Sequence, residues 1–482
     1  MEHSPKTKRR KKKFVTPQEA SIILQELLED LNCDEVAVVK NPSYINSPVE
    51  LYPLAAKHRQ PLKQLIGVVK DMDGTTTTTE PLCLHSLEWM VRKITGRMDR
   101  SVWIGLDRQK DYPHIIGNST TKHVEYLVKT YAEDIKLDEF RKAYLDAVLW
   151  TLILGKDEGR RKEVIATVPA LGLDGLLEDT QFKSAVYGER SRTNASGKYD
   201  LDTAKKLAVK LLTKYGAKFS LSRFSDKVRA AVDIYYVRYH TILMDIAAGR
   251  GRERAQELLS EPGKRLVEPM PAVALFISLI KGWLGEDLEL FYDQLANHIL
   301  AKSHIWQEAE LNRFKSRLAP LGKYFLKHPV KVAVVTSSIA YEANIILTEV
   351  FNIIREQIED WHIKDAKKKE LIKKFNSYQA VYDGFITATD SSEIRLKPHR
   401  DLYSIALHQM GIPKQDYPQV IGFEDSESGT IAIRAAGIGV CVAVPFADTA
   451  GHDLTAATYI LHGQLPETIL AYNCFLDPEV FR

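Results

Sequence analysis

The fold is decided by the stretch Leu65-Ile66-Gly67-Val68-Val69-Lys70-Asp71-Met72-Asp73-Gly74-Thr75. A continuous apolar run fills its first half, and an acidic turn that contains glycine follows. This pattern is typical of a strand in a parallel sheet, because helices bury both faces of such a sheet. Asp71 and Asp73 stand at the carboxyl end of the run, which is where doubly wound sheets bind their ligands. The stretch therefore predicts a buried parallel strand with two acidic groups at a ligand-binding edge.

Four more apolar runs have the length of a strand. They come after a gap of roughly 245 residues, which is far longer than a loop in a compact domain. The runs are Lys331–Val335, Gly384–Thr387, Val420–Phe423 and Gly439–Val444. Between them lie segments with the apolar spacing of helices, among them Tyr341–Trp361 and Asp401–Met410. Strands that alternate with helices predict an α/β fold with a doubly wound parallel sheet.

The long gap has helical patterning for much of its length, so it predicts a large, mainly helical cap domain inserted after the first core strand. Polar loops of this cap are candidates for substrate selection, and those with the most polar side chains are 107–114, 122–123 and 190–198. The chain is expected to divide into a basic tail (1–13), an N-terminal extension (14–60), a catalytic core (61–80 and 325–482) and the cap (81–324).

The basic tail is the most strongly charged part of the chain. Residues 1–13 contain seven Lys and Arg side chains and one Glu, which gives a net charge of +6, whereas the whole chain carries +3. A block of like charges is solvated and attracts polyanions such as nucleic acid. No aromatic residue interleaves with the basic ones, so a solubilising terminus or a localisation signal is favoured over nucleic-acid binding.

The N-terminal extension opens with a helix signal. Thr16 is placed as N-cap, Pro17 as the first helical residue, and Glu19 as the partner that completes a capping box. The apolar residues that follow predict an amphipathic docking helix. Val36–Lys40 is expected to form a short strand, and the rest of the extension has no clear pattern.

The cysteines and the apolar runs bear on the compartment of the protein. Four cysteines occur, with no C-x-x-C spacing, which argues against a zinc ribbon, a thioredoxin motif or a disulfide framework. No stretch approaches the roughly 20 apolar residues of a membrane span, and no apolar segment follows the basic start as in a secretory signal. We therefore expect a cytoplasmic protein that does not enter a membrane.

Three other predicted strands lead into polar residues suited to phosphate and metal chemistry. Thr336 follows the second strand, where its hydroxyl is suited either to a phosphate oxygen or to a helix N-cap. Lys397 follows the third strand, either as a surface charge or as a cation aimed at the edge of the sheet. Glu424 and Asp425 end the fourth strand. Clustered carboxylates repel one another unless a hard cation joins them, and Mg²⁺ commonly binds a few carboxylates, waters and a substrate phosphate.

Taken in order, these segments resemble the four motifs of the haloacid dehalogenase superfamily. They are Asp71-Met72-Asp73-Gly74-Thr75, Thr336, Lys397-Pro398 with Asp401 and Tyr403, and Gly422-Phe423-Glu424-Asp425-Ser426 through Gly429. The stretch 423–437 is most similar to the branch of β-phosphoglucomutases and sugar-phosphate or glycolate-type phosphatases. The resemblance covers residues 65–125 and 320–446. It implies a Rossmann-like core with an enlarged cap, and the activity of a phosphoric monoester hydrolase.

The resemblance also implies catalytic roles. Asp71 would be the nucleophile that forms an aspartyl-phosphate, and Asp73 would protonate the leaving oxygen and then activate water. Thr336 and Lys397 would bind oxygens of the transferring phosphoryl group, and Lys397 would also neutralise charge on Asp71.

The same resemblance implies a metal site and a class of substrate. Mg²⁺ would lie between the Asp71 carboxylate, the Asp73 main-chain carbonyl and Asp425, with Glu424 close by. The expected partner is a small phosphorylated metabolite, such as a sugar phosphate.

Alternative functions stay open at this point. Dehalogenases of the superfamily lack an aspartate at the place of Asp73, so phosphoryl transfer is favoured and the choice lies between a phosphatase and a phosphomutase. A histidine and an arginine typical of β-phosphoglucomutases are replaced by Cys83 and Thr120, which favours a phosphatase. A nucleic-acid-binding or partner-binding protein that uses the basic tail is the alternative from another class.

Overall fold

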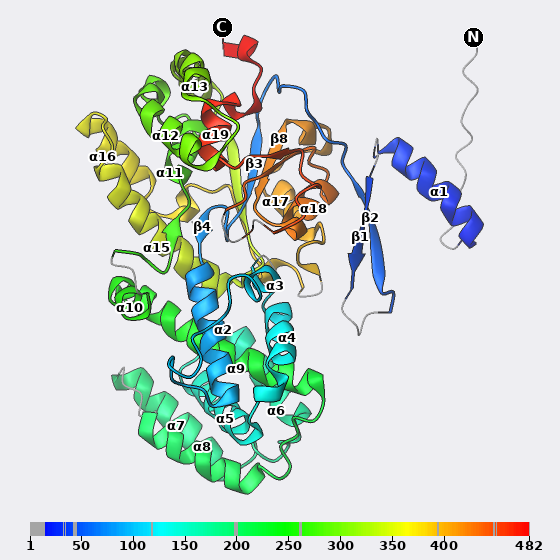
Figure 1. The fold of residues 1–482 in the computed structure, drawn as a ribbon, viewed down its shortest axis with the longest axis vertical. Coiled ribbons are helices and arrows are strands. Elements are labelled where there is room, and N and C mark those ends of the chain that lie inside the picture. The colour runs from blue at the N-terminus through cyan, green and yellow to red at the C-terminus, as the bar shows by residue number, and fades with distance from the viewer. Residues whose placement is uncertain are drawn as a thin grey trace.

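A six-stranded sheet of parallel strands organises the structure, a computed structural model (Figure 1). The structure describes residues 15–31, 33, 35–41, 46–116, 119–196, 201–259, 263–392, 395–446, 449 and 451–481, and of 191–196 and 201–205 only the backbone. The strand order is β10-β9-β8-β3-β6-β7, with β3 near the centre. The strands are β3 (Gly67–Asp71), β6 (Lys331–Val335), β7 (Gly384–Ile386), β8 (Val420–Glu424), β9 (Val440–Ala443) and β10 (Tyr459–Ile460).

The five strands predicted from the sequence are confirmed, with ends that differ by at most two residues. β10 has only two residues, so it has no periodicity that a sequence could show. Successive residues of β3 enter two different cores: Val68 packs in one cluster and Val69 in the other. The sheet is therefore buried on both faces, and the α/β doubly wound fold class is confirmed.

Helices cover the two faces of the sheet (Figure 1). One face packs against α17 (Asp401–Gln409) and α18 (Glu427–Ala435), which contribute Leu402 and Ile433 to its core. The other face packs against α11 (Val273–Ile280), α15 (Ala340–Glu359) and α19 (Gln464–Leu470). Further helices on the sheet side are α12 (Tyr292–Lys302), α13 (Glu308–Phe314), α14 (Leu318–Lys327) and α16 (Asp365–Lys374).

A helical layer lies beyond the carboxyl edge of the sheet (Figure 1). Its helices are α2 (Glu80–Thr95), α3 (Tyr112–Ile115), α4 (Thr120–Thr130), α5 (Leu137–Ile153), α6 (Glu158–Ala170), α7 (Thr180–Ser196), α8 (Leu201–Tyr215), α9 (Phe224–Ala247) and α10 (Gly251–Leu258). The chain leaves the sheet through β4 (Thr77–Thr78) and returns through β5 (Glu268–Pro269), and these two strands pair antiparallel. We call this layer the cap, since it lies in the part of the chain for which the gap predicts a mainly helical cap domain.

The helices after β5 pack against the sheet. The ring of Phe276 in α11 lies 5.3 Å from that of Phe423 in β8, and α12 packs on α19. We therefore propose that the cap ends near residue 267, earlier than the boundary at 324 expected from the sequence. The helical pattern alone could not separate cap helices from core helices, since both have one apolar face.

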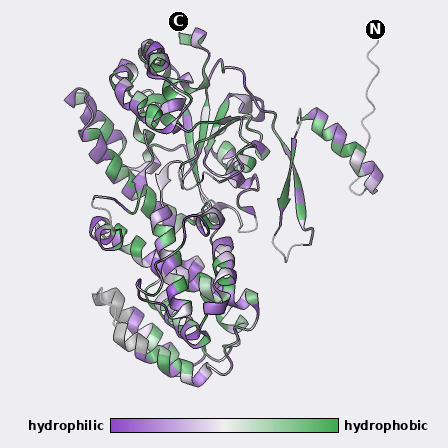
Figure 2. Cartoon of the chain, viewed as in Figure 1, coloured by the Kyte–Doolittle hydropathy of each residue, from purple (hydrophilic) through white to green (hydrophobic). Residues whose placement is uncertain are grey.

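The N-terminal extension forms α1 (Pro17–Asp30) and a hairpin of β1 (Glu35–Lys40) and β2 (Val49–Leu54) beside α17 and α18 (Figure 1). The capping box of α1 is confirmed: the Glu19 N–H donates to the Thr16 hydroxyl at 3.3 Å, and the Thr16 N–H donates to the Glu19 carboxylate at 3.0 Å. Hydrophobic and hydrophilic residues alternate around α1 (Figure 2), and none of its residues is buried. Strand β2 was not expected.

Two expectations from the sequence concern membrane-spanning segments and the basic tail. Within the described residues, none of the helices combines the length and the apolar character needed to cross a membrane. The basic tail, with its proposed role as a solubilising terminus or localisation signal, lies outside the described residues.

Candidate active site

The carboxyl ends of β8, β3 and β6 lie next to one another, and side chains from distant parts of the sequence meet there. Lys397, which follows β7 in the chain, donates from Nζ to Asp71 Oδ1 and, at 2.7 Å, to Glu424 Oε1. These three side chains are at most 7% exposed. A buried lysine that bridges two carboxylates neutralises part of their charge and fixes their positions.

Glu424 is held from both of its oxygens. Oε2 accepts hydrogen bonds from the N–H groups of the next two residues, each at 3.0 Å, and from the Ser426 hydroxyl at 2.8 Å. Oε1 accepts from Tyr403 at 3.1 Å in addition to Lys397. Gly429 makes room for this carboxylate, because a Cβ there would lie 1.8 Å from the carboxyl carbon. Glu424 is thus a fixed partner for Lys397.

A candidate metal centre is formed by Asp71, Glu424 and Asp425, which each offer a carboxylate oxygen within 4.8 Å of the others. Thr75 donates to Asp425 Oδ1 at 3.1 Å. Gly74 has a φ of +81°, and a Cβ on it would lie 2.4 Å from Asp425 Oδ2, so glycine is required by both conformation and space. Three buried carboxylates in one place offer the oxygen ligands that a hard divalent cation prefers.

The electrostatics of this cluster favour the uptake of positive charge. Burial raises the pKa of Asp71 well above its usual range; Lys397 opposes this shift, and Glu424 adds to it. Burial also raises the pKa of Asp425, as do the charges of Glu424 and Asp71. Burial disfavours the charge of Lys397, but Asp71 and Glu424 outweigh it and raise the pKa of the lysine. The cluster therefore has more negative charge than Lys397 compensates.

Asp73 lies beside the cluster and is held by hydroxyl groups. Its Oδ1 accepts from Thr79 at 2.6 Å, and its Oδ2 accepts from Thr336 at 2.9 Å and from Ser338 at 3.4 Å. Thr336 has no exposed surface. Ser337 and Ser338 line the cavity above the site, whereas Thr336 lies just behind the lining: its hydroxyl donates to Asp73 and accepts from the Ser338 N–H at 2.9 Å.

A cavity of about 520 Å³ lies between the carboxyl edge of the sheet and the cap. On the core side it is lined by Asp71, Asp73, Lys397, Glu424 and Asp425. On the cap side it is lined by Cys83, Thr120, His123, Arg160, Tyr235, Tyr236 and Tyr239, among others. A cavity of this size has room for a small molecule, and the carboxylates line its core side.

Arg160 is the cationic side chain that the cap contributes to the lining. Asp157 is the N-cap of α6 and accepts from the Arg160 N–H at 2.6 Å, which fixes the first turn of the helix. The Arg160 guanidinium donates to Asp233 at 2.5 Å and to Glu163, and it stacks 4.1 Å from the centre of the Tyr236 ring. Its positive charge is thus already paired with two carboxylates.

The polar cap segments singled out from the sequence contribute little to the lining, and two of them were wrongly expected as loops: 122–123 lies in α4, and 190–196 lies in α7. His123 is a lining residue, but none of residues 107–114 is. In the third segment, Arg190 donates to the carbonyl of Leu152 at 2.9 Å, and the side chains of 191–198 lie outside the described ones.

Sequence reasoning missed Arg160 and the three tyrosines of α9. The spacing of Tyr235, Tyr236 and Tyr239 places them on neighbouring positions of one helix face, and that was the available signal. The same helix contacts the core: His240 Nε2 lies 2.7 Å from Glu342 Oε1 of α15, and both side chains are buried.

This chain was compared with protein families, curated proteins and solved structures. No protein-family model matches the chain, and no curated protein matches it. Among solved structures the chain is similar to CbbY from Rhodobacter sphaeroides in complex with phosphate, with a TM-score of 0.33 and 12% identity over 84% of this chain and 96% of that one. It is also similar to a candidate β-phosphoglucomutase from Thermotoga maritima, with a TM-score of 0.32 and 14% identity over 84% and 99% of the two chains. At such scores the chemistry has to be argued from this chain's own residues.

Proposed function

We propose that this protein is a Mg²⁺-dependent phosphatase that hydrolyses a small phosphomonoester through an aspartyl-phosphate. The observation that carries the proposal is the buried contact of Lys397 with both Asp71 and Glu424 at the floor of the cavity. A carboxylate oxygen of Asp71 attacks the phosphorus, and the bond from phosphorus to the leaving oxygen breaks. Lys397 binds the phosphoryl oxygens, whose charge spreads as the group transfers.

Asp73 is the proposed general acid and base. It gives a proton to the leaving oxygen, and it then takes one from the water that attacks the phosphorus of the aspartyl-phosphate. The bond between phosphorus and Asp71 breaks, so inorganic phosphate leaves and Asp71 is restored. The hydrogen bonds from Thr79 and Thr336 support this role because they fix the Asp73 carboxyl group beside the cavity. Thr336 is also proposed to reach a phosphoryl oxygen when substrate is bound.

The proposed metal ligands are Asp71, Asp425 and the main-chain carbonyl of Asp73, with Glu424 close by. These residues suit a divalent cation because they offer buried carboxylate oxygens. Lys397 contacts two of these carboxylates, Asp71 and Glu424. Mg²⁺ would supply charge neutralisation to the phosphoryl oxygens.

The charges of the cavity support hydrolysis over the phosphomutase alternative. A mutase that works through an aspartyl-phosphate passes through a bisphosphate, so its cavity needs a second cationic site. The described lining contains two Lys or Arg side chains: Lys397 contacts the proposed nucleophile, and Arg160 lies on the cap side. Cys83 and Thr120, which stand where a mutase of the resembled branch has a histidine and an arginine, also line the cavity and add no cation there. The tyrosine rings and hydroxyls of α9 suit a polyhydroxylated leaving group, such as a sugar.

The test is a panel of phosphomonoesters assayed with and without Mg²⁺, with the wild type beside Asp71→Asn and Asp73→Asn. We expect phosphate release by the wild type only with Mg²⁺, and loss of activity in both variants. Full activity in either variant contradicts the mechanism. An isomer-conversion assay run in parallel separates the alternatives, because stoichiometric isomerisation without free phosphate is the result that a mutase gives.

A further inference from the structure

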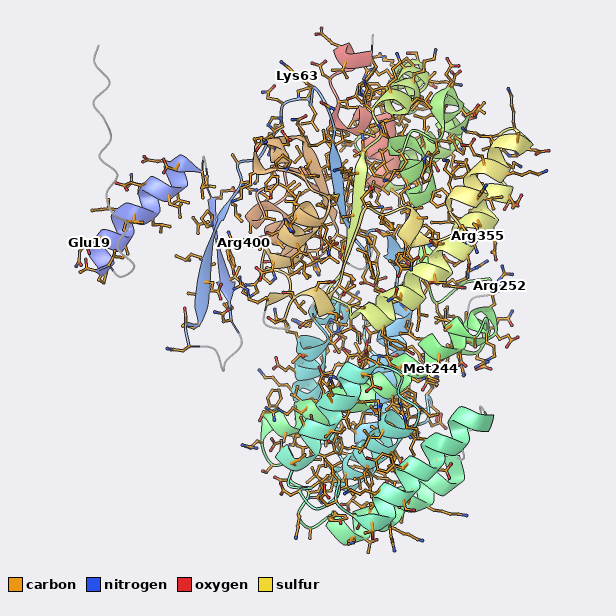
Figure 3. The ribbon with its side chains drawn as sticks, turned by 180° about the vertical axis from the view of Figure 1, so that it is seen from behind. Glu19, Lys63, Met244, Arg252, Arg355 and Arg400 are labelled. Atoms are coloured by element: carbon orange, nitrogen blue, oxygen red, sulfur yellow. The ribbon has the colours of Figure 1, made fainter. Side chains whose placement is uncertain are left out.

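The N-terminal hairpin lies against two segments that supply the site. Its buried face, formed by Ala37, Val39, Tyr52 and Leu54, packs on Ala435 of α18, the helix that follows Glu424 and Asp425. Its edge reaches residues 395–401, which contain Lys397. Figure 3 shows Arg400 of this segment between the hairpin and the core, and its guanidinium lies 6.0 Å from the centre of the Tyr52 ring.

The first anchor is an ion-pair network on Arg395. Its guanidinium donates to both carboxylate oxygens of Asp401, at 2.9 and 3.0 Å, and its remaining amino group donates to Glu50 of β2 at 2.8 Å. Two-point pairing of arginine with a carboxylate fixes direction as well as distance. Glu50 therefore ties the hairpin to the start of the Lys397 segment.

The second anchor is a hydrogen-bonded chain that runs from the partly exposed Glu50 through the buried Tyr52 to the buried His399. The Tyr52 hydroxyl lies 2.6 Å from Glu50 Oε2 and 2.7 Å from His399 Nδ1. A hydroxyl has one proton, and the carboxylate can only accept, so Tyr52 donates to Glu50 and accepts from the N–H at Nδ1 of His399. Burial and the neighbouring Glu50 raise the pKa of Tyr52 to about 12, which keeps this proton in place.

The hairpin also holds α18. The Arg434 side chain is 1% exposed, and it donates from Nε to the carbonyl of Ala55 at 2.9 Å and to Glu35 of β1. The Ala55 N–H donates back to the Arg434 carbonyl at 3.0 Å. The helix after Glu424 and Asp425 is thereby attached to the same extension as the Lys397 segment.

We propose that the β1–β2 hairpin positions Lys397, with Glu50 and Tyr52 as positioning residues that act through Arg395 and His399. Lys397 lies between these two anchored residues, so its reach to Asp71 and Glu424 depends on both anchors. The role of Lys397 in turnover rests on the proposed function, but the anchoring of residues 395–401 does not.

A double-mutant cycle tests the proposal. Tyr52→Phe keeps the ring and removes the hydroxyl, and we expect kcat to fall about tenfold or more, as small displacements of a catalytic group commonly cause. In a Lys397→Arg background the same change should have little further effect, since the residue through which Tyr52 acts is already altered. If Tyr52→Phe reduced kcat by the same factor in both backgrounds, the proposal would be overturned.

The matched control is Val38→Thr on the other face of the hairpin, where the side chain is 64% exposed. The kcat of this variant should equal that of the wild type.

Hydrogen exchange gives a readout that does not need activity. We expect backbone amides of residues 395–403 to exchange faster in Tyr52→Phe than in the wild type or Val38→Thr, while the melting temperature confirms that each variant is folded. Equal exchange in Tyr52→Phe and wild type would contradict the anchoring. If the wild type hydrolyses no phosphomonoester, the proposed function fails, and the exchange experiment still decides the role of the hairpin.

Discussion

Lys397 and Asp71 are 326 positions apart in the chain, yet they form a direct ion pair in a buried site. Asp71 ends β3, and Lys397 lies in the segment between β7 and α17. The parallel order of the sheet brings β3 and β7 to either side of β6, so that residues following both strands lie at the same edge. The contact is a consequence of topology, and it makes Lys397 the first residue to test.

Lys397→Met keeps the length of the side chain and removes its charge. Because the lysine contacts Asp71 and is proposed to bind the phosphoryl group, we expect kcat to fall by about 10²- to 10³-fold, the usual cost of losing one charge-stabilising donor. Steady-state phosphate release measures this. Lys323→Met, at an exposed lysine paired with Glu286, serves as the control and should keep full activity. A Lys397→Met enzyme within about twofold of the wild type is incompatible with the role we assign to the lysine.

The carboxylate cluster predicts a pH-dependent stabilisation by metal. Since the pKa values of Asp71 and Asp425 are raised in the folded protein, the metal-free native state binds protons more tightly there than the unfolded chain does. Its stability therefore falls as pH rises from the unfolded pKa through the raised folded values. We expect Mg²⁺ to raise the melting temperature, with a larger increment at high pH, because metal and protons compete for the same oxygens.

Asp425→Asn is the variant for that experiment. It removes one carboxylate charge, so the melting temperature without metal should rise and the increment on adding Mg²⁺ should shrink. If Mg²⁺ raised the melting temperature of Asp425→Asn as much as that of the wild type, the metal would bind elsewhere. Asp107→Asn, in a cap loop away from the cavity lining, should behave as the wild type does.

Gly429 is predicted to be essential because of the space that Glu424 occupies. A Cβ at Gly429 would lie 1.8 Å from the Glu424 carboxyl carbon, so Gly429→Ala must displace the carboxylate that holds Lys397. We expect activity to be lost along with stability, by about 1–3 kcal/mol from overpacking. Gly188→Ala is the matched control, since nothing lies within 4 Å of its Cβ position in α7, and alanine there should be neutral or stabilising. An active Gly429→Ala enzyme would show that Glu424 does not have to stay where the structure has it.

The core strands and the motif residues could be predicted from the sequence because each rests on a local pattern. The apolar run before Asp71 and the glycine at Gly74 are examples: a buried strand and a positive φ leave their mark on the residues concerned. The capping box of Thr16 and Glu19 is another such local signal.

The hairpin and the cap side of the cavity could not be predicted in the same way. Strand β2 contains Pro53, which interrupts a strand pattern and is tolerated because the two-stranded hairpin leaves edges unpaired. Arg160 and Tyr236 become cavity residues through the packing of α6 on α9, a contact between helices that neither helix shows by itself. Local patterns specify elements, whereas the cavity depends on which elements meet.

The cap is predicted to lose stability in mild acid because of His85 in α2. Arg238 of α9 donates to His85 Nε2 at 3.0 Å, and this contact requires a neutral ring. Burial, together with the charge of Arg238, lowers the pKa of His85 to about 4. The unfolded chain therefore binds more protons than the native state between about pH 6.5 and 4. In this window the free energy of unfolding decreases as the pH is lowered, by up to about 1.4 kcal/mol per pH unit.

Urea unfolding at pH 7.5 and pH 5 measures the difference. His85→Gln keeps an acceptor without a titrating group, so it should lose less stability between the two pH values than the wild type, whereas His462→Gln at an exposed site should not differ from it. Equal losses in His85→Gln and wild type would mean that another group causes the acid sensitivity.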